Sequence, residues 1–259
     1  IAEGEVKKYE RIECEMTTLI NYIKNDPRNK YKIERLSEIE SENPDEFACV
    51  HILDLCRKLC KYSPPDSSND AKEKLIQHGQ GEYSIAVATM LIDTKQLVDN
   101  PDLFVNIKEI LIQYGRGKYT REVATRLIDT LNSPKPSNKG ACGLLVDNPD
   151  VFVDILFEIA QKYPEVITIE IVNSLKKDFN LIALEKIREL LTRIVEAYPE
   201  VVATVLNENR ERLRLIVEKY PEVVATVLIK MRMDHYVNLK ESIYEGIKPS
   251  EREVFIPSK

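Results

Sequence analysis

The chain has no tryptophan and only 8 glycines among its 259 residues. It also lacks any apolar run near the roughly 18–20 residues that a helix needs to cross a bilayer, so we expect no membrane span. It has no excess of positive charge: the formal net charge is −6, which argues against a protein whose whole surface coats nucleic acid. Abundant Glu, Lys, Leu and Ile, with little Gly, favour helices instead.

Cysteines number 5 and show no disulfide-framework spacing, and Ile1–Lys8 is charged with no apolar stretch behind it. We therefore expect an intracellular, cytoplasmic protein with reduced thiols. Cys49, Cys56 and Cys60 share one face of a predicted helix, which indicates a stripe of core residues. A zinc site would need a fourth ligand, and paired CxxC spacing is absent, so we expect no metal.

Internal repetition is the strongest pattern in the sequence. Leu75–Thr94 and Leu111–Thr130 are identical at 13 of 20 positions, at an offset of 36 residues. Two further pairs of segments are near copies: Val98–Ile107 with Val146–Ile155, and Ile194–Leu206 with Ile216–Leu228. Repeats at such offsets are typical of solenoids, in which small helical units stack on one another.

Each unit is predicted to be a hairpin of two helices. The first helix begins at an Asn-Pro-Asp triplet, which places an N-cap, a proline in the first turn and an acidic residue beside it. These triplets begin at Asn43, Asn100 and Asn148. The second helix carries a short packing word, Val-Ala-Thr or Val-Ile-Thr, which begins at Val87, Val123, Val166, Val202 and Val224. Proline starts the last three of these second helices, at Pro164, Pro199 and Pro221.

The flanking and connecting segments complete a three-part organisation. Residues 1–42 are predicted to form a helical cap, 43–235 the repeat array, and 236–259 a helix with an extended tail. Within the cap we expect helices over Glu5–Asp26 and Tyr31–Ser41. Segments rich in Pro, Ser, Asn and Gly are predicted to be loops, at Ser63–Asn69 and Asn132–Gly143.

One boundary leaves two interpretations open. The offset between the last two packing words is only 22 residues, which is short for a hairpin of long helices. Residues 199–219 form either one continuous helix or two short ones, and Asn207-Glu208-Asn209 favours the break.

The helical hairpins with proline-started second helices resemble the HEAT and armadillo class of α-solenoids. The resemblance spans roughly Asn43–Asp234 and rests on architecture. It implies an all-α, right-handed superhelix of stacked hairpins that presents a long surface to a large partner, and it brings no catalytic residues.

A basic region is the main candidate binding site. Leu111–Leu145 holds six cations against two carboxylates, and these cations are Arg116, Lys118, Arg121, Arg126, Lys135 and Lys139. Gly115 and Gly117 precede a helix that Thr120 can cap, an arrangement that favours phosphate. The sister turn at Gly79 keeps the glycines without the cations, so we assign the glycines to the turn, as a helix C-cap. The alternative interpretation of the cations is a solvated face.

No residue pattern indicates catalysis. The three histidines have no Ser, Cys or Asp partner at a recognisable spacing, so we predict no catalytic residues, no enzyme activity and no cofactor. The threonine that ends each packing word either lines a concave surface or bonds a backbone carbonyl one turn earlier, and we favour the second interpretation.

These patterns lead to three hypotheses of different classes. The first is a non-enzymatic scaffold or adaptor whose partner is another protein, because a stacked array offers a long binding surface. The second is a nucleic-acid-binding repeat protein that uses residues 116–139. The third is an enzyme without a recognisable motif.

Overall fold

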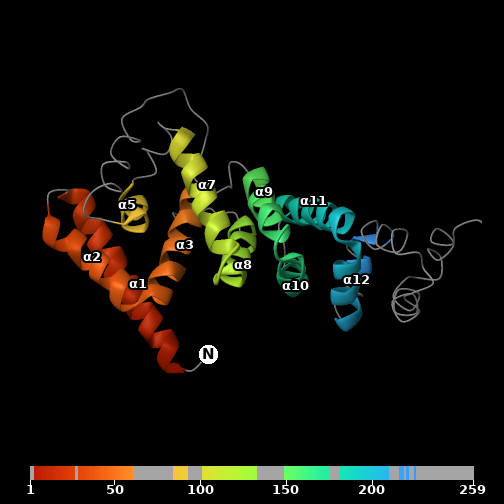
Figure 1. The fold of residues 1–259 in the computed structure, drawn as a ribbon, viewed down its shortest axis with the longest axis horizontal. Coiled ribbons are helices and arrows are strands. Elements are labelled where there is room, and N and C mark those ends of the chain that lie inside the picture. Colours follow the sequence, from red (N-terminus) through yellow and green to blue (C-terminus); the bar gives the residue numbers. More distant parts are fainter. Residues whose placement is uncertain are drawn as a thin grey trace, which may run out of the picture. The chain divides into compact units, whose positions relative to one another are not determined.

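The computed structural model describes residues 3–26, 29–60, 84–92, 101–132, 149–175 and 181–209, together with 216–218, 220, 221 and 225. Within these ranges every secondary-structure element is an α-helix, which confirms the all-α class (Figure 1). The helices fall into two compact units, of which the first runs to Tyr114 and the second begins at Gly115.

The first unit packs four of its five described helices around one core. Its helices are α1 (Glu3–Asn25), α2 (Lys30–Glu42), α3 (Pro44–Cys60), α5 (Ile85–Leu91) and α7 (Pro101–Gly115), the last of which crosses the unit boundary. The first four contact one another, and their shared core is Ile12, Met16, Ile23, Ile33, Leu36, Ile39, Phe47, Val50, Val87 and Met90. The two helices predicted for residues 1–42 are present to within two residues, and both pack on α3 and α5.

Short junctions join three pairs of consecutive helices: one residue lies between α2 and α3 and between α11 and α12, and three residues lie between α9 and α10. Asn43 separates α2 from α3: its N–H donates to the carbonyl of Ile39, and its own carbonyl accepts from the N–H of Phe47, both at 2.9 Å. Tyr163 and Tyr198 act in the same way before the next helices of the second unit. Proline starts the following helix at all three junctions, because its missing N–H lies in a turn that needs no donor.

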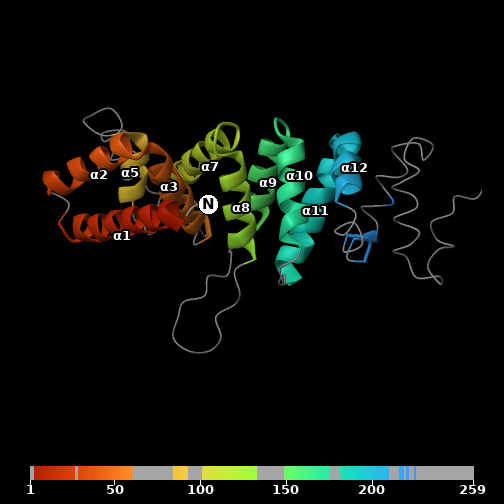
Figure 2. The ribbon, with the colours of Figure 1, turned by 90° about the horizontal axis from the view of Figure 1, so that it is seen from below.

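The second unit arranges its helices in two layers. They are α8 (Thr120–Leu131), α9 (Pro149–Ala160), α10 (Pro164–Ser174), α11 (Leu181–Ala197) and α12 (Pro199–Glu208). One layer holds α9 beside α11, and the other places α10 between α8 and α12 (Figures 1 and 2). Each helix also packs on the next one along the chain, from α8 to α12.

The packing words lie at the contacts of the α8–α10–α12 layer. Val123 and Ala124 are fully buried in α8, and Val202 and Ala203 take the same role in α12. In α10 the middle position is Ile167, which is also fully buried. Small and β-branched side chains at these positions allow close approach of neighbouring helices.

Other boundary predictions have mixed outcomes. The helix α12 ends at Glu208, and Asn209 leaves helical geometry, so residues 199–219 are not one continuous helix. The predicted loop Ser63–Asn69, the predicted loop after Asn132 and everything predicted for 236–259 lie outside the described residues. None of the helices described above combines the length and the apolar composition that crossing a membrane takes.

Gly115 has a different role from the predicted one. It is the last residue of α7, it is buried, and its φ lies outside the left-handed region, so it is not the predicted C-cap. A Cβ atom at this position would lie 2.6 Å from Cγ1 of Ile159 in α9. Glycine is therefore required because α9 approaches the backbone, not because the turn needs unusual backbone angles.

Replacing this glycine tests the close approach. Gly115→Ala is expected to destabilise the protein by about 1–3 kcal/mol, because Ile159 is fully buried and has no room to move away. The control is Gly4→Ala in α1, where a Cβ meets nothing within 4 Å and alanine favours the helix. Urea unfolding followed by circular dichroism measures both. Equal stability of the two variants would contradict the steric explanation.

Candidate functional site

The structure describes four of the six predicted basic-site residues, Arg116, Lys118, Arg121 and Arg126, all in the second unit. Lys135 and Lys139 lie outside the described residues. The turn between α7 and α8 carries Arg116 and Lys118, whereas Arg121 and Arg126 belong to α8. The side-chain contacts of these residues decide whether they are available to a ligand.

Arg116 is bound to the end of α9. Its Nε and Nη2 donate to the backbone carbonyl of Glu158 at 3.1 and 2.9 Å, and Nη2 also donates to the Glu158 carboxylate at 2.7 Å. A second bond joins the same two segments, because Lys162 Nζ donates to the backbone carbonyl of Arg116 at 2.8 Å. A cation at a helix C-terminus satisfies carbonyls that lack helical partners and interacts favourably with the helix dipole. Arg116 thus fastens the α7–α8 turn to α9.

The two arginines of α8 are also paired. Nε of Arg121 lies 2.9 Å from Oε1 of Glu170 on α10, and Nε of Arg126 lies 2.6 Å from Oε1 of Glu122, one turn earlier. The Arg121 side chain remains 73% exposed, so this pair is at the surface, where such pairs contribute little to stability. Both pairs nonetheless neutralise the local charge.

Folding therefore lowers the positive charge of the basic region. Its four described cations are accompanied by four carboxylates, Glu122, Asp129, Glu158 and Glu170, two of which come from α9 and α10. Glu158 and Glu170, like Lys162 beside Arg116, lie outside Leu111–Leu145 and reach the region only through folding. Phosphate recognition by this surface would have to compete with these carboxylates.

Thr120 does not cap α8 as predicted. The helix begins after Tyr119, which makes no side-chain cap, and the Thr120 hydroxyl donates back to the Gly117 carbonyl at 2.9 Å. At the equivalent position of the earlier repeat, Ser84 does cap its helix by accepting from the N–H of Val87 at 3.2 Å. The two near-identical segments therefore begin their helices one residue apart.

The first unit contains a buried polar cluster that the sequence did not reveal. His51 on α3 is fully buried, with Nε2 at 2.7 Å from the Thr89 hydroxyl on α5 and Nδ1 at 3.0 Å from the Tyr114 hydroxyl on α7. The Thr89 hydroxyl lies 2.8 Å from the carbonyl of Ile85 in its own helix. If Thr89 donates to that carbonyl, it accepts from His51 Nε2–H, and Tyr114 donates to Nδ1.

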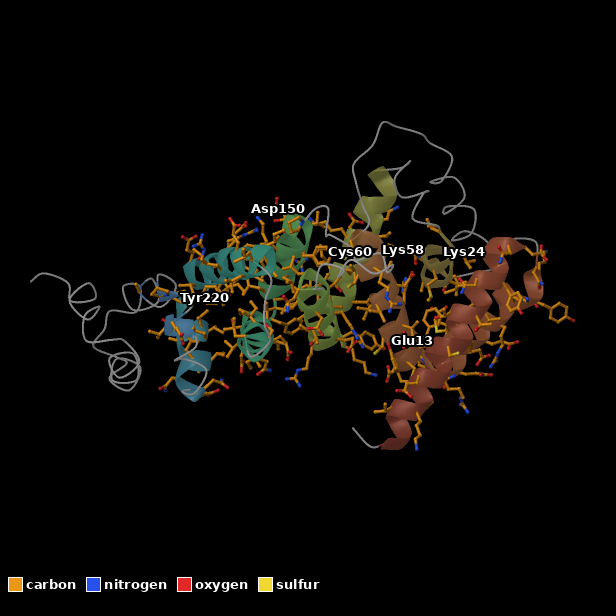
Figure 3. The ribbon with its side chains drawn as sticks, turned by 180° about the vertical axis from the view of Figure 1, so that it is seen from behind. Glu13, Lys24, Lys58, Cys60, Asp150 and Tyr220 are labelled. Atoms are coloured by element: carbon orange, nitrogen blue, oxygen red, sulfur yellow. The ribbon has the colours of Figure 1, made fainter. Side chains whose placement is uncertain are left out.

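A buried lysine holds the other end of α5. Lys58 on α3, whose side chain is 5% exposed, donates to the carbonyls of Thr89 and Met90 at 2.6 and 3.3 Å and to the Asp54 carboxylate at 2.6 Å. Figure 3 shows Lys58 toward one end of α3, close to Cys60. The ammonium caps the C-terminus of α5, and Asp54 balances its charge.

Burial determines the protonation of this cluster. It lowers the pKa of His51 to about 3, with a further contribution from the positive charge of Lys58. It also raises the pKa of Tyr114 to about 12, helped by the carboxylate of Glu40. Both rings are therefore neutral near pH 7. Because His51 and Thr89 have no exposed surface, the cluster is arranged to hold α5 in place and is closed to a substrate.

The cysteine and threonine predictions have separate outcomes. Cys56 and Cys60 are buried and Cys49 is half-buried, which confirms a core stripe on α3. Among the described residues, no three His, Cys, Asp or Glu side chains are grouped as a metal site requires. Thr168 and Thr204 donate to the carbonyl four residues earlier, as predicted. Thr125 differs, because its hydroxyl donates to Glu170 on the neighbouring helix at 3.2 Å.

Removing one hydroxyl from the cluster tests its structural role. Thr89→Val keeps the side-chain volume but leaves His51 Nε2 buried without a partner, so we expect a loss of about 1–3 kcal/mol. The matched control is Thr204→Val, whose hydroxyl is exposed and bonds only its own helix. Hydrogen exchange of the α3 and α5 amides measures both variants. The same protection in Thr89→Val as in wild type would rule out this role.

The depressed pKa of His51 predicts a pH dependence of stability. The unfolded chain takes up this proton near pH 6.5, whereas the folded chain does so only near pH 3. Stability from the neutral imidazole is therefore present above pH 6.5 and falls as the pH drops toward 3, by up to about 1.4 kcal/mol per pH unit. Urea unfolding between pH 7 and 5 should show this slope in wild type and lose it in His51→Gln. An unchanged slope in the variant would assign it to other groups.

Comparison with known proteins gives no relative from which a function can be carried over: no family model, curated protein or solved structure matches the chain.

Proposed function

We propose that this protein is a non-enzymatic scaffold or adaptor that binds another protein, built as a right-handed α-solenoid of the HEAT and armadillo kind. The observation that carries the proposal is the two-layer order of the second unit, in which α9 lies beside α11 and α10 between α8 and α12. Near-identical sequence repeats accompany that order. Units that pack only on their neighbours form an extended surface on which recognition spreads over many side chains.

The surface of the α8–α10 layer supports a protein partner better than a small ligand. A shallow hollow between these helices has a volume of about 70 Å³, far below the roughly 300–1,000 Å³ of small-molecule sites. Its lining comes from α8 and α10 and combines polar side chains with apolar surface: Thr125, Ile128, Asp129, Glu170, Asn173 and Ser174. Protein interfaces combine apolar surface with polar contacts in this way.

The nucleic-acid hypothesis receives no comparable support. Within the described part of residues 116–139, the three arginines are paired with carboxylates of the same unit. Nucleic-acid binding depends on cations that replace the counterions of phosphates, and these pairs would have to be broken first.

Recovery of partners from native cells tests the proposal. The tagged full-length protein is purified with and without nuclease, and co-purifying molecules are identified. We expect a protein partner that survives nuclease. Loss of every partner after nuclease, with nucleic acid recovered beforehand, would overturn the scaffold proposal in favour of nucleic-acid binding.

A pair of substitutions then locates the interface. Thr125→Arg places a bulky cation in the α8–α10 hollow and is expected to weaken partner recovery by about tenfold or more. Thr192→Arg introduces the same side chain on α11, in the other layer, where the Thr192 hydroxyl bonds only its own helix. Equal recovery of the partner by both variants would move the interface away from this layer.

A further inference from the structure

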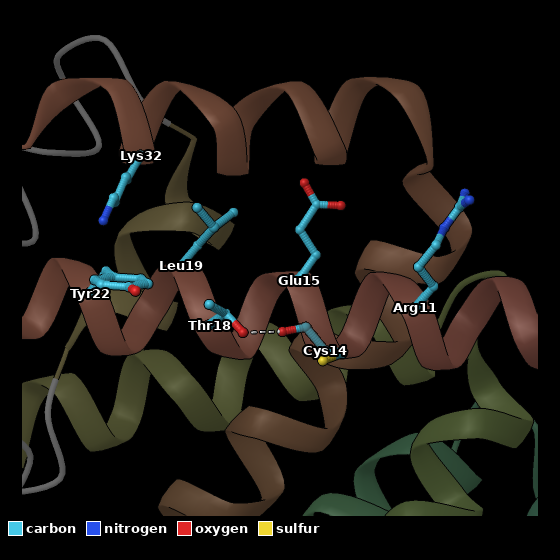
Figure 4. A pocket seen from close by; sticks show the side chains of 7 residues that line it. All are labelled: Arg11, Cys14, Glu15, Thr18, Leu19, Tyr22 and Lys32. Carbon is cyan, nitrogen blue, oxygen red and sulfur yellow. Dashed lines mark hydrogen bonds between the residues drawn. The ribbon is translucent and has the colours of Figure 1, made fainter.

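A second surface feature lies on the first unit, between α1 and α2. It is an open hollow of about 490 Å³, lined by Arg11, Cys14, Glu15, Thr18, Leu19 and Tyr22 of α1 and by Lys32 of α2 (Figure 4). The α1 residues recur every three or four positions, so they form one stripe along the helix. From Arg11 to Tyr22 this stripe extends for about 16 Å, or three turns.

The floor of the hollow is mainly apolar. Leu19 packs partly against the core of the unit, and Tyr22 leaves 55% of its surface exposed. The hydroxyl of Thr18 donates to the backbone carbonyl of Cys14 at 2.8 Å, so its proton is already used within α1. The Cys14 thiol is free and exposed. An apolar stripe with an exposed aromatic ring is typical of the central part of a protein interface.

The charge of the hollow is positive at both ends. Figure 4 shows Arg11 at one end and Lys32 at the other, where Lys32 Nζ lies 3.4 Å from the centroid of the Tyr22 ring. No carboxylate of the described residues forms an ion pair with either cation. The acidic residue of the lining, Glu15, is already paired with Arg35 at 2.9 Å. The hollow is thus locally cationic on a chain whose net charge is −6.

We propose that this hollow is a docking site for an acidic amphipathic helix of a partner protein. Apolar residues on one face of that helix would cover Leu19 and Tyr22, and carboxylates toward its two ends would meet Arg11 and Lys32. Helix-in-groove recognition uses anchors at the same three- and four-residue spacing as the α1 stripe. This docking proposal and the proposed function both involve a polypeptide partner, but they concern different surfaces of the protein.

The spacing of the two cations argues for a helix and against a phosphate ligand. Arg11 and Lys32 lie at opposite ends of an apolar stripe, so one phosphate cannot contact both of them. A nucleic-acid backbone would need cations that follow one another along the surface. An amphipathic helix supplies apolar and acidic groups at both required places.

A peptide-display selection on the full-length protein tests the proposal. The probe is a library of random peptides of about sixteen residues, long enough for a helix that covers the stripe. Peptides that bind the double variant Arg11→Glu/Lys32→Glu are removed by counter-selection. We expect the survivors to be acidic, with apolar residues at helical spacing, and to bind the double variant about tenfold more weakly or worse.

Two readouts place the peptide in the hollow. Cys14 lines it and is exposed, so a bound peptide should slow alkylation of this thiol by iodoacetamide, followed by peptide mass mapping. The matched control is Lys30→Glu/Arg57→Glu, which changes the charge equally at two exposed residues outside the hollow and should bind like wild type. Circular dichroism confirms that both double variants are folded.

Three results would overturn the docking proposal: no peptide survives counter-selection, the survivors are neutral or basic, or they leave Cys14 alkylation unchanged. Failure here is distinguishable from failure of the scaffold proposal, because a native partner that survives nuclease and depends on Thr125 supports the scaffold whatever the peptides do. A peptide that binds Thr125→Arg as tightly as wild type shows that the two surfaces act separately.

Discussion

Short junctions that end in Asn43, Tyr163 and Tyr198 join consecutive helices, and the packing of the helices on either side depends on them. At each one the backbone N–H closes the first helix and the carbonyl opens the second, so consecutive helices stay in contact along their lengths. Their apolar stripes then face each other, and the helices of the second unit sort into two layers. Proline in the next position favours this geometry, since it removes a donor that has no partner there.

In the first unit, polar contacts fix the position of α5, which apolar packing alone does not determine. The helix α5 has only seven residues, too few to be stable alone. It is held by Lys58 at its C-terminus, by His51 at Thr89, and by the capping hydroxyl of Ser84, which also donates to Glu40 at 2.5 Å. Because the side chains of His51, Thr89 and Lys58 are buried and their bonds are directional, they select one position for α5 among those that its apolar side chains would allow.

Ion pairs formed on folding determine which cations of this protein remain available to a partner. The sequence draws attention to residues 116–139, yet each of the three described arginines there is paired with a carboxylate of the same unit, and Arg116 fastens the α7–α8 turn to α9. Arg11 and Lys32 attract no attention in the sequence, because they lie far apart in it among many acidic residues. The fold brings them to the two ends of one apolar hollow, where their charges are available to an acidic partner.

The sequence by itself determined the class of the fold, most helix starts and the buried packing words, because proline, capping residues and apolar periodicity act within a few residues. Only the tertiary structure decided the roles of His51, Arg116 and Gly115. The partners of His51 lie 38 and 63 residues away, and Glu158 lies 42 residues from Arg116. No local pattern encodes such distances, so a histidine that appeared isolated became the centre of a buried network, and a predicted ligand-binding arginine became a clamp between helices.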